Sequence, residues 1–123
     1  MATRESDSYA LLAGVDLTTK EGAFGKQAAG KVIACNTLGE RADCVIGNAP
    51  IINAVADCYP RAGKIVIVQV GAAAVVQDAE LTPDANGMAK TAVSTNVVRS
   101  RALQAGAPGA FIRAHWVDAY IKP

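Results

Sequence analysis

At 123 residues the chain has room for one domain built around one core. Its 12 basic and 11 acidic residues leave a net charge of +1, and no two basic residues are adjacent. This pattern excludes the basic stripe of a nucleic-acid binder and the basic helix of a membrane-surface protein. No apolar run approaches the ~20 residues that span a bilayer. The opening residues lack the apolar region of a signal peptide, so we expect synthesis in a cytosol.

The composition predicts a core that is weaker than its hydrophobic content suggests. The chain is 51% hydrophobic, but it contains 25 Ala and 11 Gly, and only 5% of its residues are aromatic. Buried apolar surface stabilises by roughly 25 cal/mol per Å², and an Ala side chain has little surface to bury. A chain of this size also leaves about a third of its unfolded surface exposed. We therefore expect contacts between subunits to add the missing burial.

The polar start of the chain predicts an extended N-terminal arm over residues 1–14, followed by a single β-domain over residues 15–123. Within the arm, Ser6–Ala13 has a weak helical pattern. Short runs rich in β-branched residues and bounded by Gly, Asn or Asp indicate strands. In the first half of the domain these runs are Val15–Leu17, Ala23–Lys26, Lys31–Cys35 and Asp43–Gly47.

The segment Asn48–Gly63 is ambiguous, because Pro50 precedes apolar residues with partial helical spacing. We predict a long loop there with one helical turn. The clearest strand, Lys64–Val70, comes next, and Gly71 separates it from a second strand. Asn86-Gly87 indicates a tight hairpin turn, because both residues adopt positive φ readily. The strands expected in this half are Lys64–Val70, Ala72–Val76, Ala79–Thr82, Met88–Val93, Val97–Leu103 and Ala110–Val117, with an extended tail over Asp118–Pro123.

This succession of short strands separated by turns predicts an all-β fold, a small β-barrel or β-tulip-like sandwich of short strands. The three cysteines, Cys35, Cys44 and Cys58, lack the paired spacing of zinc sites, and we expect buried, reduced thiols. One disulfide with a leftover thiol is the alternative.

Catalytic apparatus is scarce in the sequence. The single histidine, His115, lies within a predicted strand, and no Gly-x-Ser-x-Gly motif supplies a serine nucleophile. A thiol enzyme that pairs one cysteine with His115 is the remaining catalytic alternative. The carboxylates Asp78, Glu80 and Asp84 are either a weak cation site or solvated residues beside a turn. We predict that the protein is not an enzyme and that it has no metal and no cofactor.

Several residues suit protein contacts better than chemistry. Arg99 and Arg101 share one face of a predicted strand, with Arg113 on the next, and guanidinium groups bind carboxylates of a partner subunit well. A solvated face is the alternative. Trp116 and Tyr120 belong to a class of side chains that anchor interfaces, although they also fill cores. Three residues of the predicted arm complete the set of candidate contact residues, which is Arg4, Glu5, Tyr9, Arg99, Arg101, Arg113, Trp116 and Tyr120.

Residues 15–117 resemble the head decoration, or cement, proteins of tailed phages. The matching segments are an opening of the Asp-Leu-x-x-x-x-Gly type, a strand ending in Gly, a small-residue strand, an Asn-Gly turn and a later Gly-containing turn. In this sequence they are Asp16–Phe24, Val66–Gly71, Ala72–Val76, Asp84–Ala89 and Ala102–Gly109. The longer connection over Asn48–Gly63 and the absence of an Ala-Gly-Asp turn in Gln77–Leu81 depart from the family pattern.

The resemblance implies a β-barrel or β-tulip-like domain that binds the outer surface of a virion capsid as a symmetric oligomer. Its partners would be the major capsid protein and further copies of itself, as a homotrimer at three-fold positions or a homodimer at two-folds. The expected function is a cement that stabilises contacts between major capsid subunits. A small ligand- or carbohydrate-binding β-domain is the alternative, and it requires an exposed aromatic platform.

Overall fold

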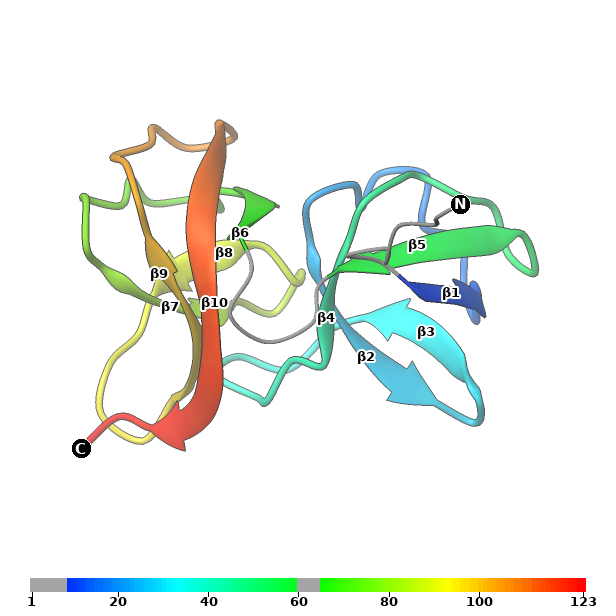
Figure 1. Ribbon diagram of the computed structural model, residues 1–123, viewed down its shortest axis with the longest axis horizontal. Coiled ribbons are helices and arrows are strands. Elements are labelled where there is room, and N and C mark those ends of the chain that lie inside the picture. Colours follow the sequence, from blue (N-terminus) through cyan, green and yellow to red (C-terminus); the bar gives the residue numbers. More distant parts are fainter. Residues whose placement is uncertain (1–8, 60–64) are drawn as a thin grey trace, which may run out of the picture.

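The computed structural model describes residues 9–59 and 65–123; residues 1–8 and 60–64 lie outside the described residues. The described chain forms two antiparallel five-stranded sheets that lie side by side (Figure 1). The first half of the chain builds one sheet and the second half builds the other. We refer to them as the N-terminal and C-terminal sheets. Among the described residues there is no helix, and therefore none with the length and apolarity to cross a membrane.

The N-terminal sheet consists of β1 (Tyr9–Leu12), β2 (Phe24–Ala28), β3 (Lys31–Ala34), β4 (Cys44–Ile46) and β5 (Val55–Tyr59). Their spatial order is β1-β5-β4-β2-β3. The β2–β3 hairpin turns through Ala29 and Gly30, both at positive φ, as a two-residue type I′ turn requires. Strand β4 has a neighbour on each side and packing on both faces, so all three of its residues are buried.

The C-terminal sheet consists of β6 (Ile65–Gln69), β7 (Glu80–Pro83), β8 (Ala89–Thr91), β9 (Val97–Ala102) and β10 (Phe111–Ile121). Their spatial order is β6-β10-β9-β7-β8. Strand β10 is the longest, and it contains an irregularity between Trp116 and Tyr120 where its register against β9 shifts. Inward residues alternate with outward residues along β6 and along most of β10, the period of two that a sheet with one covered face requires.

Two hydrophobic cores stabilise this arrangement. One lies within the N-terminal sheet and is formed by Ala13, Leu17, Val32, Ala34, Cys44, Ile46, Ala56 and Cys58. The other is shared between the sheets and is formed by Phe24, Cys35, Ala42, Val45, Val66, Val68, Val70, Val75, Ala79, Leu81, Ala89, Ala102, Ile112, Ala114 and Trp116. Because the second core draws on both sheets, the two halves of the chain form one packed unit.

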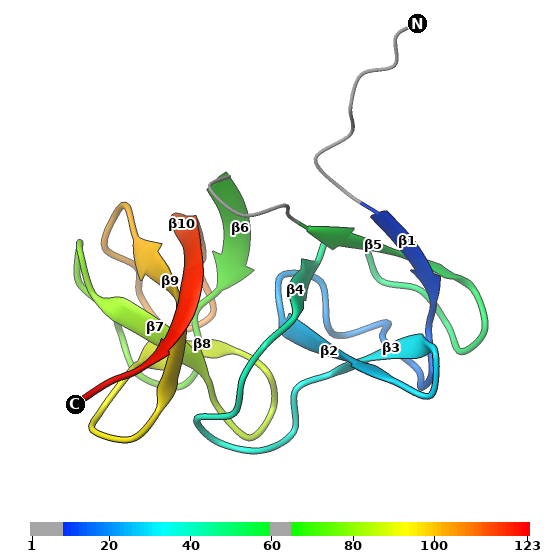
Figure 2. The same cartoon turned by 60° about the horizontal axis from the view of Figure 1, so that its bottom comes forward.

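Main-chain hydrogen bonds also join the two sheets, whose arrangement Figure 2 shows from a second direction. The Phe24 N–H donates to the carbonyl of Gly87 at 2.7 Å. The Gln69 N–H donates to the carbonyl of Gly22 at 2.9 Å. The Asn-Gly turn predicted from the sequence is therefore also a docking element, because Gly87 contacts the start of β2.

The all-β class predicted from the sequence is confirmed, in a sandwich-like form. Neither sheet closes into a barrel. Single bridges, Ala13 with Val32 and Val70 with Ala89, bring the edges of each sheet together at one point. Pairing does not continue beyond these bridges, so each sheet curls without becoming a continuous cylinder.

The structure corrects three local predictions in the first half of the chain. Ser6–Ala13 is not helical where it is described, because Tyr9–Leu12 pairs with β5 and alternates between inward and outward residues. Residues 9–12 of the predicted arm are thus part of the sheet, and residues 1–8 lie outside the described residues. Val15–Leu17 is a loop in which Leu17 is buried. The long loop predicted at Asn48–Gly63 contains β5, whose inward residues Ala56 and Cys58 are too small to give a clear strand pattern.

In the second half, the predicted strand Ala72–Val76 is absent. Ala72, Ala73 and Ala74 are exposed, and only Val75 forms a bridge, to Gly106. Three exposed alanines bury too little apolar surface to hold a strand against the core. The other strands expected in this half are confirmed within a few residues, and β10 extends into the tail as far as Ile121.

Candidate interaction surfaces

The residues proposed for protein contacts lie in several places. Arg4 and Glu5 are outside the described residues. Tyr9 is half-buried, opposite Cys58 in the β1–β5 register and packed against the N-terminal core. Burial is the main cause that raises the pKa of the Tyr9 hydroxyl above its usual value. This side chain therefore contributes to the packing of its own subunit.

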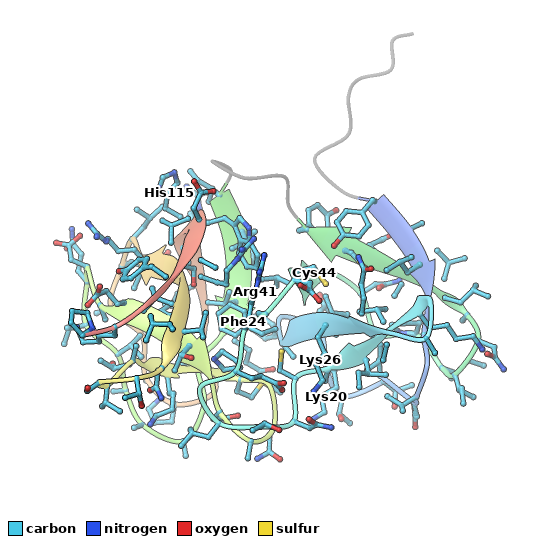
Figure 3. All side chains as sticks on the ribbon, turned by 90° about the horizontal axis from the view of Figure 1, so that it is seen from below. Lys20, Phe24, Lys26, Arg41, Cys44 and His115 are labelled. Carbon is cyan, nitrogen blue, oxygen red and sulfur yellow. The ribbon has the colours of Figure 1, made fainter. Side chains whose placement is uncertain are left out.

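Trp116 is only 1% exposed and packs in the shared core. Of the two roles that the sequence allowed for this side chain, interface anchor or core residue, it has the second. Its ring contacts Phe24 from the other sheet, and the Arg99 guanidinium carbon lies 4.6 Å from the Trp116 ring centroid. Burial, and then repulsion from Arg41, lowers the pKa of Arg99 below its usual value. Figure 3 shows Phe24 and Arg41 in the region between the two sheets. Because the single tryptophan is buried, it offers no exposed platform for a carbohydrate.

Arg101 and Tyr120 belong to one polar cluster around Glu80 on the C-terminal sheet. Arg101 is the cross-strand partner of Glu80. The Tyr120 hydroxyl and the Lys122 ammonium both donate hydrogen bonds to the Glu80 carboxylate. The bond from Lys122 is the largest cause that lowers the pKa of the Glu80 carboxyl, and the bond from Tyr120 is the next. The bond to Glu80 in turn raises the pKa of the Tyr120 hydroxyl. The carboxylate that Arg101 and Tyr120 face is thus within the same subunit.

Arg113 lies on the outward face of β10 and is not part of the Glu80 cluster. The outward residues of β10 begin with Phe111, Arg113 and His115, and Arg113 is opposite Ile67 of β6. His115 is opposite Ile65. Ile65, Ile67 and Phe111 are each at least half exposed. This face therefore combines basic side chains with an exposed apolar surface.

The same apolar side chains continue into a groove of about 340 Å³ between the two sheets. We call it the inter-sheet groove; its main lining residues are Val45, Ile46, Tyr59, Ile65, Ile67 and Phe111. One wall is the β6 strand and the other is the end of β4 with Tyr59 beside it. The volume is at the lower end of the range for ligand pockets, roughly 300–1,000 Å³. The lining is mostly apolar, so the groove suits an apolar side chain or a short apolar segment.

The β6 wall of the groove is a partly unpaired strand edge. In an antiparallel pair, the main-chain groups of alternate residues point toward the partner strand. The Val70 N–H donates to Ala110, so even-numbered residues of β6 face β10 and odd-numbered residues face away from it. Gln69 uses its outward N–H on Gly22. By this alternation, the main-chain groups of Ile65 and Ile67 point away from β10, and among the described residues no strand pairs with this edge of β6.

A second apolar surface lies at the far end of the N-terminal sheet. Leu12 and Val55 are cross-strand partners on β1 and β5. Beside them, Ile51 and Ile52 form a loop held by the bond from Ala54 N–H to the Ile51 carbonyl, 3.0 Å long. All four aliphatic residues are at least 44% exposed. We call the surface formed by Leu12, Ile51, Ile52 and Val55 the aliphatic tip.

Sequence reasoning missed both surfaces, although one signal was present. Pro50-Ile51-Ile52-Asn53 places two bulky aliphatic residues between turn-forming residues. We interpreted this run as helical spacing, whereas the structure makes it an exposed loop. Ile65 and Ile67 were correctly assigned to a strand, but their exposure depends on where the N-terminal sheet lies.

The thiol-enzyme alternative requires a cysteine next to His115, and the structure places the three cysteines in or beside one sheet and His115 on the other. Cys44 and Cys58 lie in the N-terminal sheet and Cys35 follows β3, whereas His115 is on the C-terminal sheet, as Figure 3 shows for Cys44 and His115. All three cysteine side chains are buried, as the sequence predicted, and none is paired with another. Among residues 9–59 and 65–123, no three His, Cys, Asp or Glu side chains gather as a metal site. Asp84 instead accepts bonds from the main-chain N–H groups of Asn86 and Met88 in its own turn.

Comparisons with known proteins bear on the fold. Neither the protein-family models nor the curated proteins include a match to this sequence. The chain is similar in structure to the N base of the head fiber gp8.5 of bacteriophage phi29, with a TM-score of 0.65. The similarity covers 94% of this chain and 98% of that chain, at 13% sequence identity. Nearly all of the chain thus resembles that head fiber base in fold.

Proposed function

We propose that this protein is a structural component of a phage head. It binds the outer surface of the shell as a symmetric oligomer and stabilises contacts between major capsid subunits. The observation that carries the proposal is the end-to-end similarity of fold with the phi29 head fiber base. The sequence resemblance to head decoration proteins supports the same role independently.

The described surfaces support adhesion as the mode of action. The inter-sheet groove and the aliphatic tip together leave seven large apolar side chains about half exposed, among them Ile51, Ile65 and Phe111. Extended apolar patches on a small soluble chain are typical of protein-binding sites. Closed symmetry repeats each such contact, so modest individual contacts sum to a stable attachment.

Co-sedimentation with empty phage heads that lack this protein tests the proposal. We expect the protein to pellet with the heads, to saturate at a fixed ratio to the major capsid subunit, and to raise the temperature at which the heads rupture. Protein centrifuged without heads is the control and should remain in the supernatant. A protein that stays in the supernatant at every head concentration would contradict the proposed function.

A further inference from the structure

We propose that copies of this chain bind one another head to tail, with the aliphatic tip of one copy seated in the inter-sheet groove of the next. The inference deepens the oligomer included in the proposed function by naming the two surfaces that meet. Its test needs only the isolated protein. Failure of this inference is therefore distinguishable from failure of attachment to heads.

The two surfaces match in chemistry and differ in shape. The tip is a projecting loop with Ile51 and Ile52 at its end, next to the exposed pair Leu12 and Val55. The groove is a hollow of about 340 Å³ with an apolar lining. A projecting aliphatic loop fills such a hollow, whereas two hollows placed face to face remain unfilled. The shapes therefore favour unlike surfaces in contact over a two-fold contact of like surfaces.

The position of the tip requires that it meet the groove of another molecule. The loop between β4 and β5 turns at the end of the N-terminal sheet that is farthest from the C-terminal sheet (Figures 1 and 2). The groove lies between the two sheets, lined by β6 and β4. The tip and the groove of one chain are thus separated by the length of the N-terminal sheet. A head-to-tail contact generates a closed ring when the rotation between copies allows it.

Main-chain groups and charges at the two surfaces are also complementary. The outward main-chain groups of Ile65 and Ile67 are available to the chain of an incoming loop, which adds hydrogen bonds to apolar burial. Both surfaces carry charges of both signs. At the tip, Lys31 Nζ donates to Asn53 Oδ1 at 2.9 Å, and Asp57 is two residues from Val55 on β5. At the groove, Glu21 is a lining residue and Arg113 is exposed opposite Ile67. Each charge of the tip therefore has a group of opposite sign at the groove.

The contact is tested by one charge substitution in each surface. Ile52→Asp alters the tip and Ile67→Asp alters the groove; the two native side chains are 53% and 50% exposed, so neither change enters a core. Sedimentation equilibrium should give an oligomer for the native chain and the 12.6 kDa monomer for each variant. Val93→Asp, at a side chain that is 54% exposed away from both surfaces, is the matched control and should keep the native mass.

Mixing the two variants distinguishes a head-to-tail contact from a two-fold one. The Ile52→Asp chain keeps a native groove and the Ile67→Asp chain keeps a native tip, so one intact contact can form between them. The mixture should give a 1:1 complex of twice the chain mass that does not grow further. In a two-fold contact between grooves, the Ile52→Asp chain alone would keep the native mass, and in one between tips the Ile67→Asp chain alone would do so. In either case mixing the variants would form no additional complex.

Three results would overturn the inference: a native chain that is monomeric, a variant that keeps the native mass, or a mixture that contains only monomers. Fluorescence of the buried Trp116 verifies that each variant is folded. If Ile67→Asp alters that emission, Ile65→Asp on the same edge replaces it. The corresponding substitute at the tip is Ile51→Asp.

Discussion

Phe24 of β2 and Trp116 of β10 lie with their ring centroids 6.3 Å apart and their planes inclined by 33°, so an aromatic contact joins the two sheets. Neither ring is more than 1% exposed. The two residues are the largest of the side chains buried in the shared core. In a chain so rich in Ala, this one contact supplies a large share of the apolar area that holds the halves together.

Replacing Trp116 should therefore weaken the whole fold. We expect Trp116→Ala to lower the free energy of unfolding by about 3–5 kcal/mol, because it removes buried area and leaves a cavity. Urea denaturation followed by circular dichroism measures the change. Val93→Ala, at a side chain that is 54% exposed and away from both proposed contact surfaces, is the control and should cost less than about 1 kcal/mol. Equal losses for the two variants would show that Trp116 does not organise the core.

Gly87 occupies a turn where both conformation and space favour glycine. Its φ is +84°, and an added Cβ would lie 3.0 Å from the Cys35 carbonyl oxygen and 3.2 Å from that of Phe24. We expect Gly87→Ala to destabilise the protein by about 1–3 kcal/mol, measured by thermal or urea unfolding. Gly30→Ala is the matched control, because Gly30 also has positive φ but open space around it. If both changes cost the same, crowding at the contact between the sheets contributes nothing.

Glu40 should make stability depend on pH below neutrality. Its carboxylate accepts bonds from Lys26 Nζ at 2.7 Å and from the N–H groups of Asn36 and Thr37. Burial raises the pKa of Glu40, but the bonds from Lys26 and from the two main-chain groups outweigh it, and the net pKa is lowered. A lowered pKa means that the stabilisation is present at neutral pH and is lost as pH falls through the folded-state value.

Glu40→Gln tests this dependence. At pH 7 we expect a loss of about 1 kcal/mol in unfolding free energy, since the site is near the surface and partly screened. As the pH falls from 6 to 3 the native protein should lose stability and the gap to the variant should close. Urea unfolding at several pH values measures both. A gap that is constant over this range would contradict the assignment.

The thiols should be inert until the protein unfolds. Burial raises the pKa of Cys35 to about 12, against a usual value of 9.0, which lowers its thiolate fraction roughly a thousand-fold. Cys44 and Cys58 are fully buried. At pH 8 an aromatic disulfide reagent should label none of the three thiols in the native state and all three in denaturant. Fast labelling of a native thiol would indicate that its strand opens readily.

Deletion of residues 1–8 removes no residue of the described strands, because β1 begins at Tyr9. We expect deletion of residues 1–8 to leave the unfolding transition unchanged and to weaken co-sedimentation with empty heads. The comparison between full-length and shortened chains gives the contribution of the arm. Undiminished binding would remove residues 1–8, including Arg4 and Glu5, from the proposed contact set.

Local signals in the sequence were sufficient for much of the fold. Strands such as Lys31–Ala34 and Ile65–Gln69 have β-branched residues and flanking turns. The turn at Asn86-Gly87 is also present, but only Gly87 adopts positive φ, and the turn lies within a longer connection between the paired residues Pro83 and Ala89. Strands β1 and β5 were missed for a physical reason. The inward residues of β5, Ala56 and Cys58, are small, and β1 alternates over only four residues. Both strands are therefore stabilised by partners distant in sequence rather than by a pattern of their own.

The sequence by itself determined the all-β class, the balanced charge and most strand positions, because these depend on residue type and on neighbours along the chain. Only the tertiary structure decided that the halves form separate sheets, that Trp116 is buried, and that Ile51, Ile52, Ile65 and Ile67 are exposed. The physical reason is that an apolar strand residue is inward or outward according to what covers it. In this protein the covering elements come from the other half of the chain and, in our proposal, from another copy.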